Sequence, residues 1–291
     1  MKRLLTGSLL LIAVAASTQQ APLAPAEGTE VMLVAVSRNN AVLAGGIFTG
    51  TMLEPRRLSV EPLAWLTSAG QWRGFQCDGK NQSGCRKFEK TYLSKPHTYT
   101  VVSADGRGAT VQGAPTSLDD CFGYTGSSTY SGASVSGTAI AASSAEMFTT
   151  GPSAKRIIGH DANSIRAALS SLVPAKLDST KELRIYSLSL EGQDFYVVQR
   201  AFQDYASKAG YNHRLKLIFA IGTMTQGRFH LLHWKKNIDD ENELALGTIH
   251  LKNGRDFLVT TVSDPESQSF RVYGVKNGRL TVVYFGGGSS C

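Results

Sequence analysis

The sequence lacks the short motifs that identify many common enzyme classes. Its 291 residues contain no Gly-x-Ser-x-Gly nucleophile elbow, no phosphate-binding glycine loop and no dinucleotide-binding fingerprint. It also lacks Cys-x-x-Cys pairs and Asp-rich calcium loops, which are common signs of a zinc or calcium site. We therefore expect no cofactor and no metal, and the sequence favours a protein that binds rather than catalyses.

Long apolar runs are missing everywhere except at the N-terminus. Lys2 and Arg3 precede an apolar stretch from Leu4 to Ala16, and small residues follow it. This is the three-part pattern of a secretory signal peptide. The stretch is shorter than the roughly 20 residues that span a bilayer as a helix. We predict that residues 1–20 are a cleavable signal peptide, that the protein is secreted or periplasmic, and that no transmembrane anchor remains after cleavage.

Cysteine is scarce, but its number is even. Four cysteines in an exported chain indicate disulfide bonds, and they allow three pairings. We favour Cys77–Cys85, which closes a short loop with two glycines, and Cys121–Cys291, which ties the last residue to the N-terminal half. In a simple chain-entropy model, so long a second loop stabilises the folded state by about 4–5 kcal/mol.

Acidic residues are outnumbered, with 23 against 30 basic residues. Once Lys2 and Arg3 are removed, the whole excess lies between residues 151 and 291. Lys235 and Lys236 belong to this basic part, and they are candidate contacts to a glycan or another anionic polymer. The alternative is a solvated sheet face, because these charges alternate with apolar residues. Export and the lack of a recognition motif argue against nucleic acid as a partner.

Alternating apolar residues predict an N-terminal β-rich lobe over residues 28–150, which includes the disulfide loop. Its clearest β-rich runs are Val31–Val36, His97–Ser103 and Ala109–Gln112. The segment Glu61–Phe75 is instead expected to be a short helical turn or a packed loop. Residues 126–151 are low in complexity, and Gly151-Pro152 after them is the candidate boundary between two lobes.

The second lobe, residues 151–291, is predicted to be one short helix followed by an eight-strand β-meander. Asp161 is a candidate cap for a helix from Ala162 to Leu172, with Ile165 and Leu169 on one face. Four hairpin turns follow, and they contain Gly192, Gly227, Gly254 and Gly278. The predicted fold class is mainly β, an antiparallel hairpin meander of the sandwich or propeller-like type.

Three groups of titratable residues resemble catalytic or metal sites without meeting their requirements. His160 and Asp161 are neighbours in sequence and do not form a triad by themselves. His230 and His233 would suit zinc on a helix, but the period of two in a strand sends them to opposite faces. The acidic cluster lacks the spacing of a calcium loop, and we expect a solvated turn at Asp239, Asp240, Glu241 and Glu243.

Aromatic residues are concentrated between residues 65 and 130, where Trp65, Trp72 and Tyr92 form a candidate stacking surface for a sugar. The alternative is that these side chains pack in the core. We expect an exported, non-catalytic binding or interaction protein whose partner is a glycan, an envelope component or another protein. The competing hypothesis is a secreted hydrolase whose acidic catalytic residues have no local signature.

Overall fold

The structure is a computed structural model, and its described residues are 30–38, 58–74, 90, 97–102, 109–113, 128–132, 138–152, 154–170, 184–203, 215–236, 242–263 and 267–290. The predicted signal peptide, Tyr92 and all four cysteines lie outside these residues. Both disulfide bonds therefore stay predictions. Among the described residues, no helix is long and apolar enough to cross a membrane.

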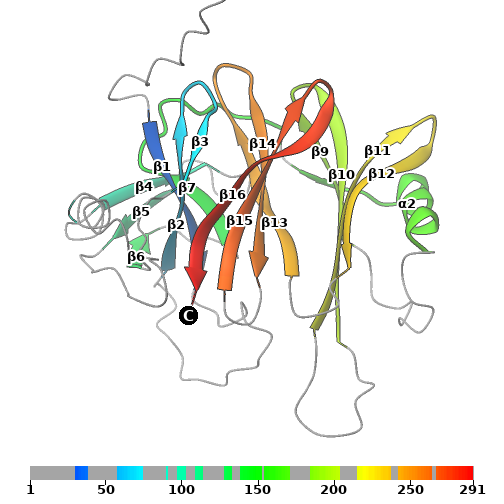
Figure 1. The fold of residues 1–291 in the computed structure, drawn as a ribbon, viewed down its shortest axis with the longest axis horizontal. Coiled ribbons are helices and arrows are strands. Elements are labelled where there is room, and N and C mark those ends of the chain that lie inside the picture. The colour runs from blue at the N-terminus through cyan, green and yellow to red at the C-terminus, as the bar shows by residue number, and fades with distance from the viewer. Residues whose placement is uncertain are drawn as a thin grey trace, which may run out of the picture.

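The described part of the chain forms three antiparallel sheets (Figure 1). The N-terminal sheet contains β1 (Glu30–Arg38), β2 (Leu58–Thr67), β3 (Trp72–Arg73), β4 (His97–Val101), β5 (Thr110–Gly113), β6 (Ser128–Gly132) and β7 (Thr138–Ala142). The β8–β12 sheet contains β8 (Lys155–Arg156), β9 (Arg184–Leu190), β10 (Gln193–Gln203), β11 (Leu215–Thr225) and β12 (Arg228–Lys236). The β13–β16 sheet contains β13 (Asn242–His250), β14 (Asp256–Ser263), β15 (Ser267–Lys276) and β16 (Arg279–Ser290). The predicted mainly β fold class, an antiparallel hairpin meander, is confirmed.

The N-terminal sheet has the strand order β1-β7-β4-β5-β6-β2-β3, and β1 pairs with β2 as well as with β7. The sheet therefore curls around an apolar interior of its own. Met32, Val34, Tyr99 and Val111 are buried in this interior. The predicted hairpin between β4 and β5 is present, with Tyr99 opposite Val111.

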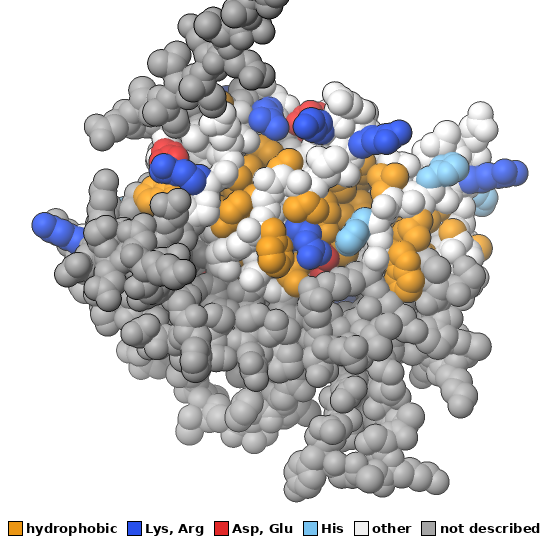
Figure 2. Space-filling model, in the orientation of Figure 1, with side chains coloured by type: hydrophobic (Ala, Val, Ile, Leu, Met, Phe, Trp, Pro, Cys, Tyr) orange, Lys and Arg blue, Asp and Glu red, His pale blue; other side chains and the backbone are white. Residues whose placement is uncertain are grey.

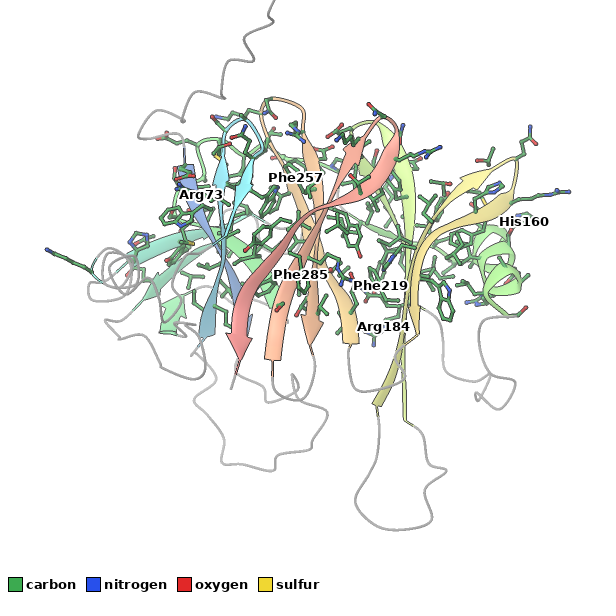
Figure 3. The ribbon with its side chains drawn as sticks, in the orientation of Figure 1. Arg73, His160, Arg184, Phe219, Phe257 and Phe285 are labelled. Carbon is green, nitrogen blue, oxygen red and sulfur yellow. The ribbon has the colours of Figure 1, made fainter. Side chains whose placement is uncertain are left out.

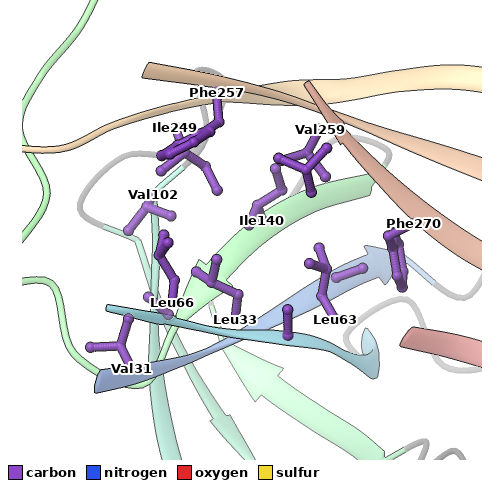
Figure 4. Packing of buried hydrophobic residues seen from close by; sticks show 14 of the residues in the cluster. Val31, Leu33, Leu63, Leu66, Val102, Ile140, Ile249, Phe257, Val259 and Phe270 are labelled. Atoms are coloured by element: carbon purple, nitrogen blue, oxygen red, sulfur yellow. The ribbon is translucent and has the colours of Figure 1, made fainter. Parts of the chain in front are cut away.

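The β13–β16 sheet lies in the middle of the molecule, between the other two sheets (Figure 1). One of its faces packs on the outside of the N-terminal sheet (Figure 4). In this layer, Leu33, Leu66 and Ile140 meet Phe257 and Val259, and all five side chains are buried. Each such side chain stabilises the folded state by about 1.5–3 kcal/mol relative to leaving it exposed.

The other face of the β13–β16 sheet packs on the β8–β12 sheet. Leu188 and Phe219 from the β8–β12 sheet are buried here with Leu258 and Tyr273. We call this layer the intersheet interface, and both sites considered below lie in it. The far face of the β8–β12 sheet is covered by α2 (His160–Ser170) at the right of Figure 1.

Three of the four predicted turns in the meander are two-residue turns in which both residues have positive φ. The pairs and their φ values are Glu191-Gly192 (49° and 76°), Gln226-Gly227 (51° and 71°) and Asn277-Gly278 (52° and 69°). Two successive positive φ angles define the turn whose twist matches that of the flanking strands. Glycine in second place is required because the left-handed region disfavours side chains.

The two KNGR tetrapeptides form different turns. Asn277 has positive φ, whereas in the first copy only Gly254 does. Tertiary contacts account for the difference, because Asn253 donates a hydrogen bond to the carbonyl of Ser68 at 2.7 Å. Arg255 also donates to the carbonyl of Ala69 at 3.2 Å. The first copy is therefore shaped by its docking on the N-terminal lobe.

Two local predictions are corrected by the structure. Residues 61–67 do not form a helical turn, because they belong to β2. Pro62 is accommodated at a register shift, where Val34 faces Pro62 and Leu33 faces Ala64. The helix begins at His160, so Asp161 lies in its first turn rather than at the cap. A carboxylate in that turn still interacts favourably with the helix dipole.

Candidate functional site

Glu243 is the most deeply buried charged side chain described, with 0% of its side chain exposed. Its Oε1 accepts hydrogen bonds from the hydroxyls of Tyr273 at 2.7 Å and Thr260 at 2.8 Å. Its Oε2 accepts a hydrogen bond from Nη1 of Arg271, which forms a salt bridge with it. These four residues come from β13, β14 and β15 and form what we call the Glu243 centre. The expectation that Glu243 lies in a solvated turn is wrong.

His233 approaches the Glu243 centre from the opposite sheet. Its Nε2 lies 3.6 Å from Oε2 of Glu243, and its ring packs against Phe219 and Tyr273 at centroid distances of 6.0 and 5.7 Å. The position of His233 depends on a bulge in β12. Ile221 faces His233 whereas the next residue, Gly222, faces Leu231, so one residue of β12 is extra.

This bulge overturns the expectation that His230 and His233 lie on opposite faces. Cross-strand partners share a face of the sheet, and His230 and His233 pair with Thr223 and Ile221, which are two residues apart. Both histidines therefore belong to the face that turns towards the β13–β16 sheet. Within the described segments, no group of three or more His, Cys, Asp or Glu residues is arranged to hold a metal ion.

The electrostatics of the centre keep Glu243 ionised. Burial by itself raises the pKa of a carboxyl group, because it penalises the charged form. Here the imidazole of His233, the hydroxyls of Tyr273 and Thr260, and the charge of Arg271 outweigh that effect, and the pKa of Glu243 is lowered. Burial and the neighbouring carboxylate raise the pKa of Tyr273. An ionised carboxylate whose oxygens are already occupied is suited to positioning its neighbours rather than to proton transfer.

The centre is linked to the molecular surface through Arg271 and Phe285. The guanidinium carbon of Arg271 lies 5.2 Å from the centroid of the Phe285 ring, in a cation–π contact. Arg271 and Phe285 face each other across β15 and β16. Phe285 is 56% exposed. Figure 3 labels Phe285 at β16, with Phe219 of β11 to its right on the side of the β8–β12 sheet. The ion pair with Glu243 thus fixes the guanidinium of Arg271, and the exposed ring of Phe285 packs on that guanidinium.

Exposed apolar side chains are concentrated on two strands, β12 and β16. Among the described residues, six large hydrophobic side chains are exposed, and five of them lie on β12 and β16. They are Leu231, Leu232, Val282, Val283 and Phe285. Figure 2 shows hydrophobic side chains around a basic group and a histidine in the middle of this face. Val282 and Phe285 pair with Tyr273 and Arg271 and share one side of the sheet, and we call these two residues the β16 strip. Val283 is the extra residue of a bulge and lies near Gly274 and Phe257 on the other side.

The tryptophans predicted to bind a ligand are held in place by packing contacts with other side chains. Trp72 stacks on Tyr284 at a centroid distance of 5.9 Å and meets Phe257 edge-on at 5.2 Å. Trp65 is half-buried in β2 and packs against the interior of the N-terminal sheet. These contacts give both indoles a packing role, so neither carries the function proposed below. Tyr92, the third member of that surface, lies outside the described residues.

The basic residues predicted to bind an anionic polymer lie at the end of β12. Lys235 and Lys236 pair through their backbones with Phe219 and Ile218. His160 and Asp161 lie at the start of α2, where the imidazole is 3.6 Å from the carboxylate and is largely exposed. The structure brings neither His160 nor Asp161 into the Glu243 centre.

Sequence reasoning missed the Glu243 centre itself. The local signal was weak, because Glu243 is followed by three consecutive apolar residues, Leu244-Ala245-Leu246, whose pattern does not assign a face to Glu243. The identities of its partners depend on the pairing of β13, β14 and β15, which a single sequence does not display. Comparison of the chain with family models, with curated proteins and with solved structures finds no match.

Proposed function

We propose that this chain is an exported, non-catalytic interaction protein that binds another polypeptide through the β16 strip. The observation that carries the proposal is that Val282 and Phe285 are both exposed on one side of β16, and that Phe285 contacts the Arg271 of the buried ion pair. Exposed apolar residues scattered singly need no explanation, whereas a cluster marks a surface that contacts something else.

The composition of the surface favours a protein partner over a glycan. Val282 is aliphatic, and it offers dispersion contacts and no hydrogen bonds. Phe285 resting on Arg271 combines an aromatic residue with arginine, and both types are enriched at the cores of protein interfaces. A sugar would require stacking aromatics with polar groups around them. Of the two tryptophans predicted for that role, Trp72 packs against Tyr284 and Phe257, and Trp65 packs against the interior of the N-terminal sheet.

The Glu243 centre explains how the strip is prepared for binding. Ordering a side chain on association costs about 0.5–1.5 kcal/mol for a rotamer-rich group. Arg271 is already fixed by Glu243, and it supports the Phe285 ring from below. Because the ring is held before binding, part of that cost is met during folding. We therefore assign the buried ion pair a positioning role and not a catalytic one.

Site-specific photocrosslinking tests the proposal. Phe285 is replaced by the photoreactive p-benzoylphenylalanine in the full-length protein, which is expressed and exported by its host cell before irradiation. The matched control carries the same residue at Ile158, which is the sixth exposed large hydrophobic residue and is 76% exposed. We expect a polypeptide adduct of discrete mass from position 285 and none from position 158.

Two results would count against a polypeptide partner. If position 285 yields no adduct, or the same adducts as position 158, the strip is not a binding surface. If the adduct at position 285 stains for carbohydrate and contains no second polypeptide, the glycan hypothesis is favoured instead. Export has its own measurement, since the intact mass of the recovered protein should correspond to loss of about the first 20 residues.

A further inference from the structure

A cavity of about 210 Å³ lies in the intersheet interface. It is lined by the part of β13 that follows Glu243, from Ala245 to Thr248. Its apolar walls include Leu188, Val197 and Leu258. Its polar wall residues are Tyr186, Gln199 and Thr248, and no charged side chain lines it. The cavity adjoins a bulge in β13, where Ala245 faces Thr260 and Gly247 faces Val259, so that Leu246 is extra. Bulges of this kind are over-represented beside binding and active sites.

Thr248 is the end of a buried chain of hydrogen bonds. Its Oγ1 lies 3.1 Å from Nε2 of His250, and Nδ1 of His250 lies 2.8 Å from Oδ1 of Asp256. Oδ2 of Asp256 accepts a hydrogen bond from the backbone N–H of Glu191 at 2.6 Å. The backbone of Gly151 packs closely on the His250 ring, because a Cβ atom at this position would lie 2.1 Å from Cδ2 of His250.

The order of donors and acceptors in this chain sets what Thr248 offers to the cavity. The carboxylate of Asp256 only accepts hydrogen bonds, so Nδ1 of His250 carries the hydrogen. In the neutral ring, Nε2 is then an acceptor and takes the hydroxyl hydrogen of Thr248. The lone pairs of Thr248 Oγ1 then remain able to accept a hydrogen bond from a molecule in the cavity. Thr248 therefore presents a hydrogen-bond acceptor, and a bound molecule would have to supply the donor.

We propose that this cavity is a binding site for a small, neutral, single-ring compound that carries a hydroxyl group. The size is appropriate, since a cavity of about 150 Å³ holds benzene and this one has room for a substituent as well. The apolar walls suit the faces of the ring, and the lack of charged lining residues disfavours an ion. The ligand hydroxyl donates to Oγ1 of Thr248. This site is separate from the β16 strip and does not depend on the proposed function.

Phenol and toluene are the probes, because they have nearly the same shape and differ in the hydroxyl group. Binding is followed in the full mature chain by the methyl NMR signals of Leu188, Val197 and Leu258, which line the cavity. We expect both probes to shift these signals. In Thr248→Val, the dissociation constant for phenol should rise about fivefold through loss of one hydrogen bond, and that for toluene should not rise. Thr248→Ser keeps the hydroxyl and should bind phenol within about twofold of the parent protein.

A cavity-filling variant supplies the second arm. Ala245 lines the cavity, so Ala245→Phe should abolish the shifts from both probes. Ala167→Phe, at an exposed position of α2, introduces the same side chain and should leave them unchanged. The proposal is overturned if neither probe shifts the methyl signals at 5 mM, or if Thr248→Val weakens both probes equally. It is also overturned if a folded Ala245→Phe variant still binds phenol or toluene. If Ala245→Phe does not fold, the Thr248→Val and Thr248→Ser results alone decide whether the proposal stands.

Discussion

Replacement of Arg271 by methionine should leave the carboxylate of Glu243 buried without its cation. No part of the Glu243 side chain is exposed, and 17% of Arg271 is, so water cannot readily take the place of the guanidinium. Removal of one partner from a buried pair costs about 3–5 kcal/mol, because the remaining charge is uncompensated. Methionine preserves most of the apolar stem, so lost packing adds little. We expect the free energy of unfolding of Arg271→Met to fall by about 3–5 kcal/mol.

Urea unfolding, followed by tryptophan fluorescence, measures this change, and a double-mutant cycle isolates its cause. Glu243→Gln removes the charge that Arg271→Met leaves behind, so the double variant should be more stable than Arg271→Met. Arg73→Met is the control, because Arg73 also pairs with a carboxylate, that of Glu30, but is 61% exposed. Its loss should stay below about 1 kcal/mol. If Arg271→Met and Arg73→Met lose equal stability, or the double variant loses the sum of both single changes, the ion pair does not organise this centre.

Further predictions concern pH and a turn. The pKa of Glu243 is lowered from 4.5, so its contribution to stability is present above pH 4.5 and is lost as the pH falls through the folded-state value. Melting temperatures should fall in that range for the parent protein and less steeply for Glu243→Gln. Burial raises the pKa of Tyr284 from 10 to about 12, so stability should fall as the pH rises from 10 to 12. Tyr284→Phe should remove that alkaline loss and cost about 1 kcal/mol at pH 7 in urea unfolding, through its 3.0 Å hydrogen bond to the carbonyl of Leu63. Gly227→Ala should lower the unfolding free energy by about 1–2 kcal/mol, because its φ is 71° although a methyl group there would meet no neighbour.

The features that the sequence predicts well are those set by neighbouring residues. Asn277-Gly278 selects its turn through local backbone preferences, and the strands on either side follow from alternation. The same tetrapeptide at Asn253 shows where this reasoning ends, because contacts with Ser68 give it a different backbone. Residues 61–67 were similarly misjudged, since their strand exists through pairing with β1 rather than through local preference.

The candidate site was less predictable for a specific geometric reason. A period of two assigns the faces of a strand, and one extra residue reverses every assignment beyond it. Bulges in β12 and β13 do this, and they bring His233, Glu243 and His250 to the same interface. A third register shift, between Val272 and Tyr273, leaves Val283 extra and puts Val282 and Phe285 on one face of β16. Without these bulges, strict alternation would separate residues that the structure brings together.

The β13–β16 sheet also holds most of the buried polar residues described. A sheet that is covered on both faces is expected to be almost wholly apolar. Yet five of the six buried polar or charged residues described lie on β13 and β14, namely Glu243, Thr248, His250, Thr260 and Thr261. Buried polar groups are costly unless they are hydrogen-bonded, and the networks around Glu243 and His250 supply partners for all of these residues except Thr261. An apolar sheet would fold with fewer constraints, so the polar residues need a reason beyond stability. The network around Glu243 holds Arg271, which in turn holds Phe285. The network around His250 orients Thr248, which lines the cavity. Each network therefore has a reason of its own.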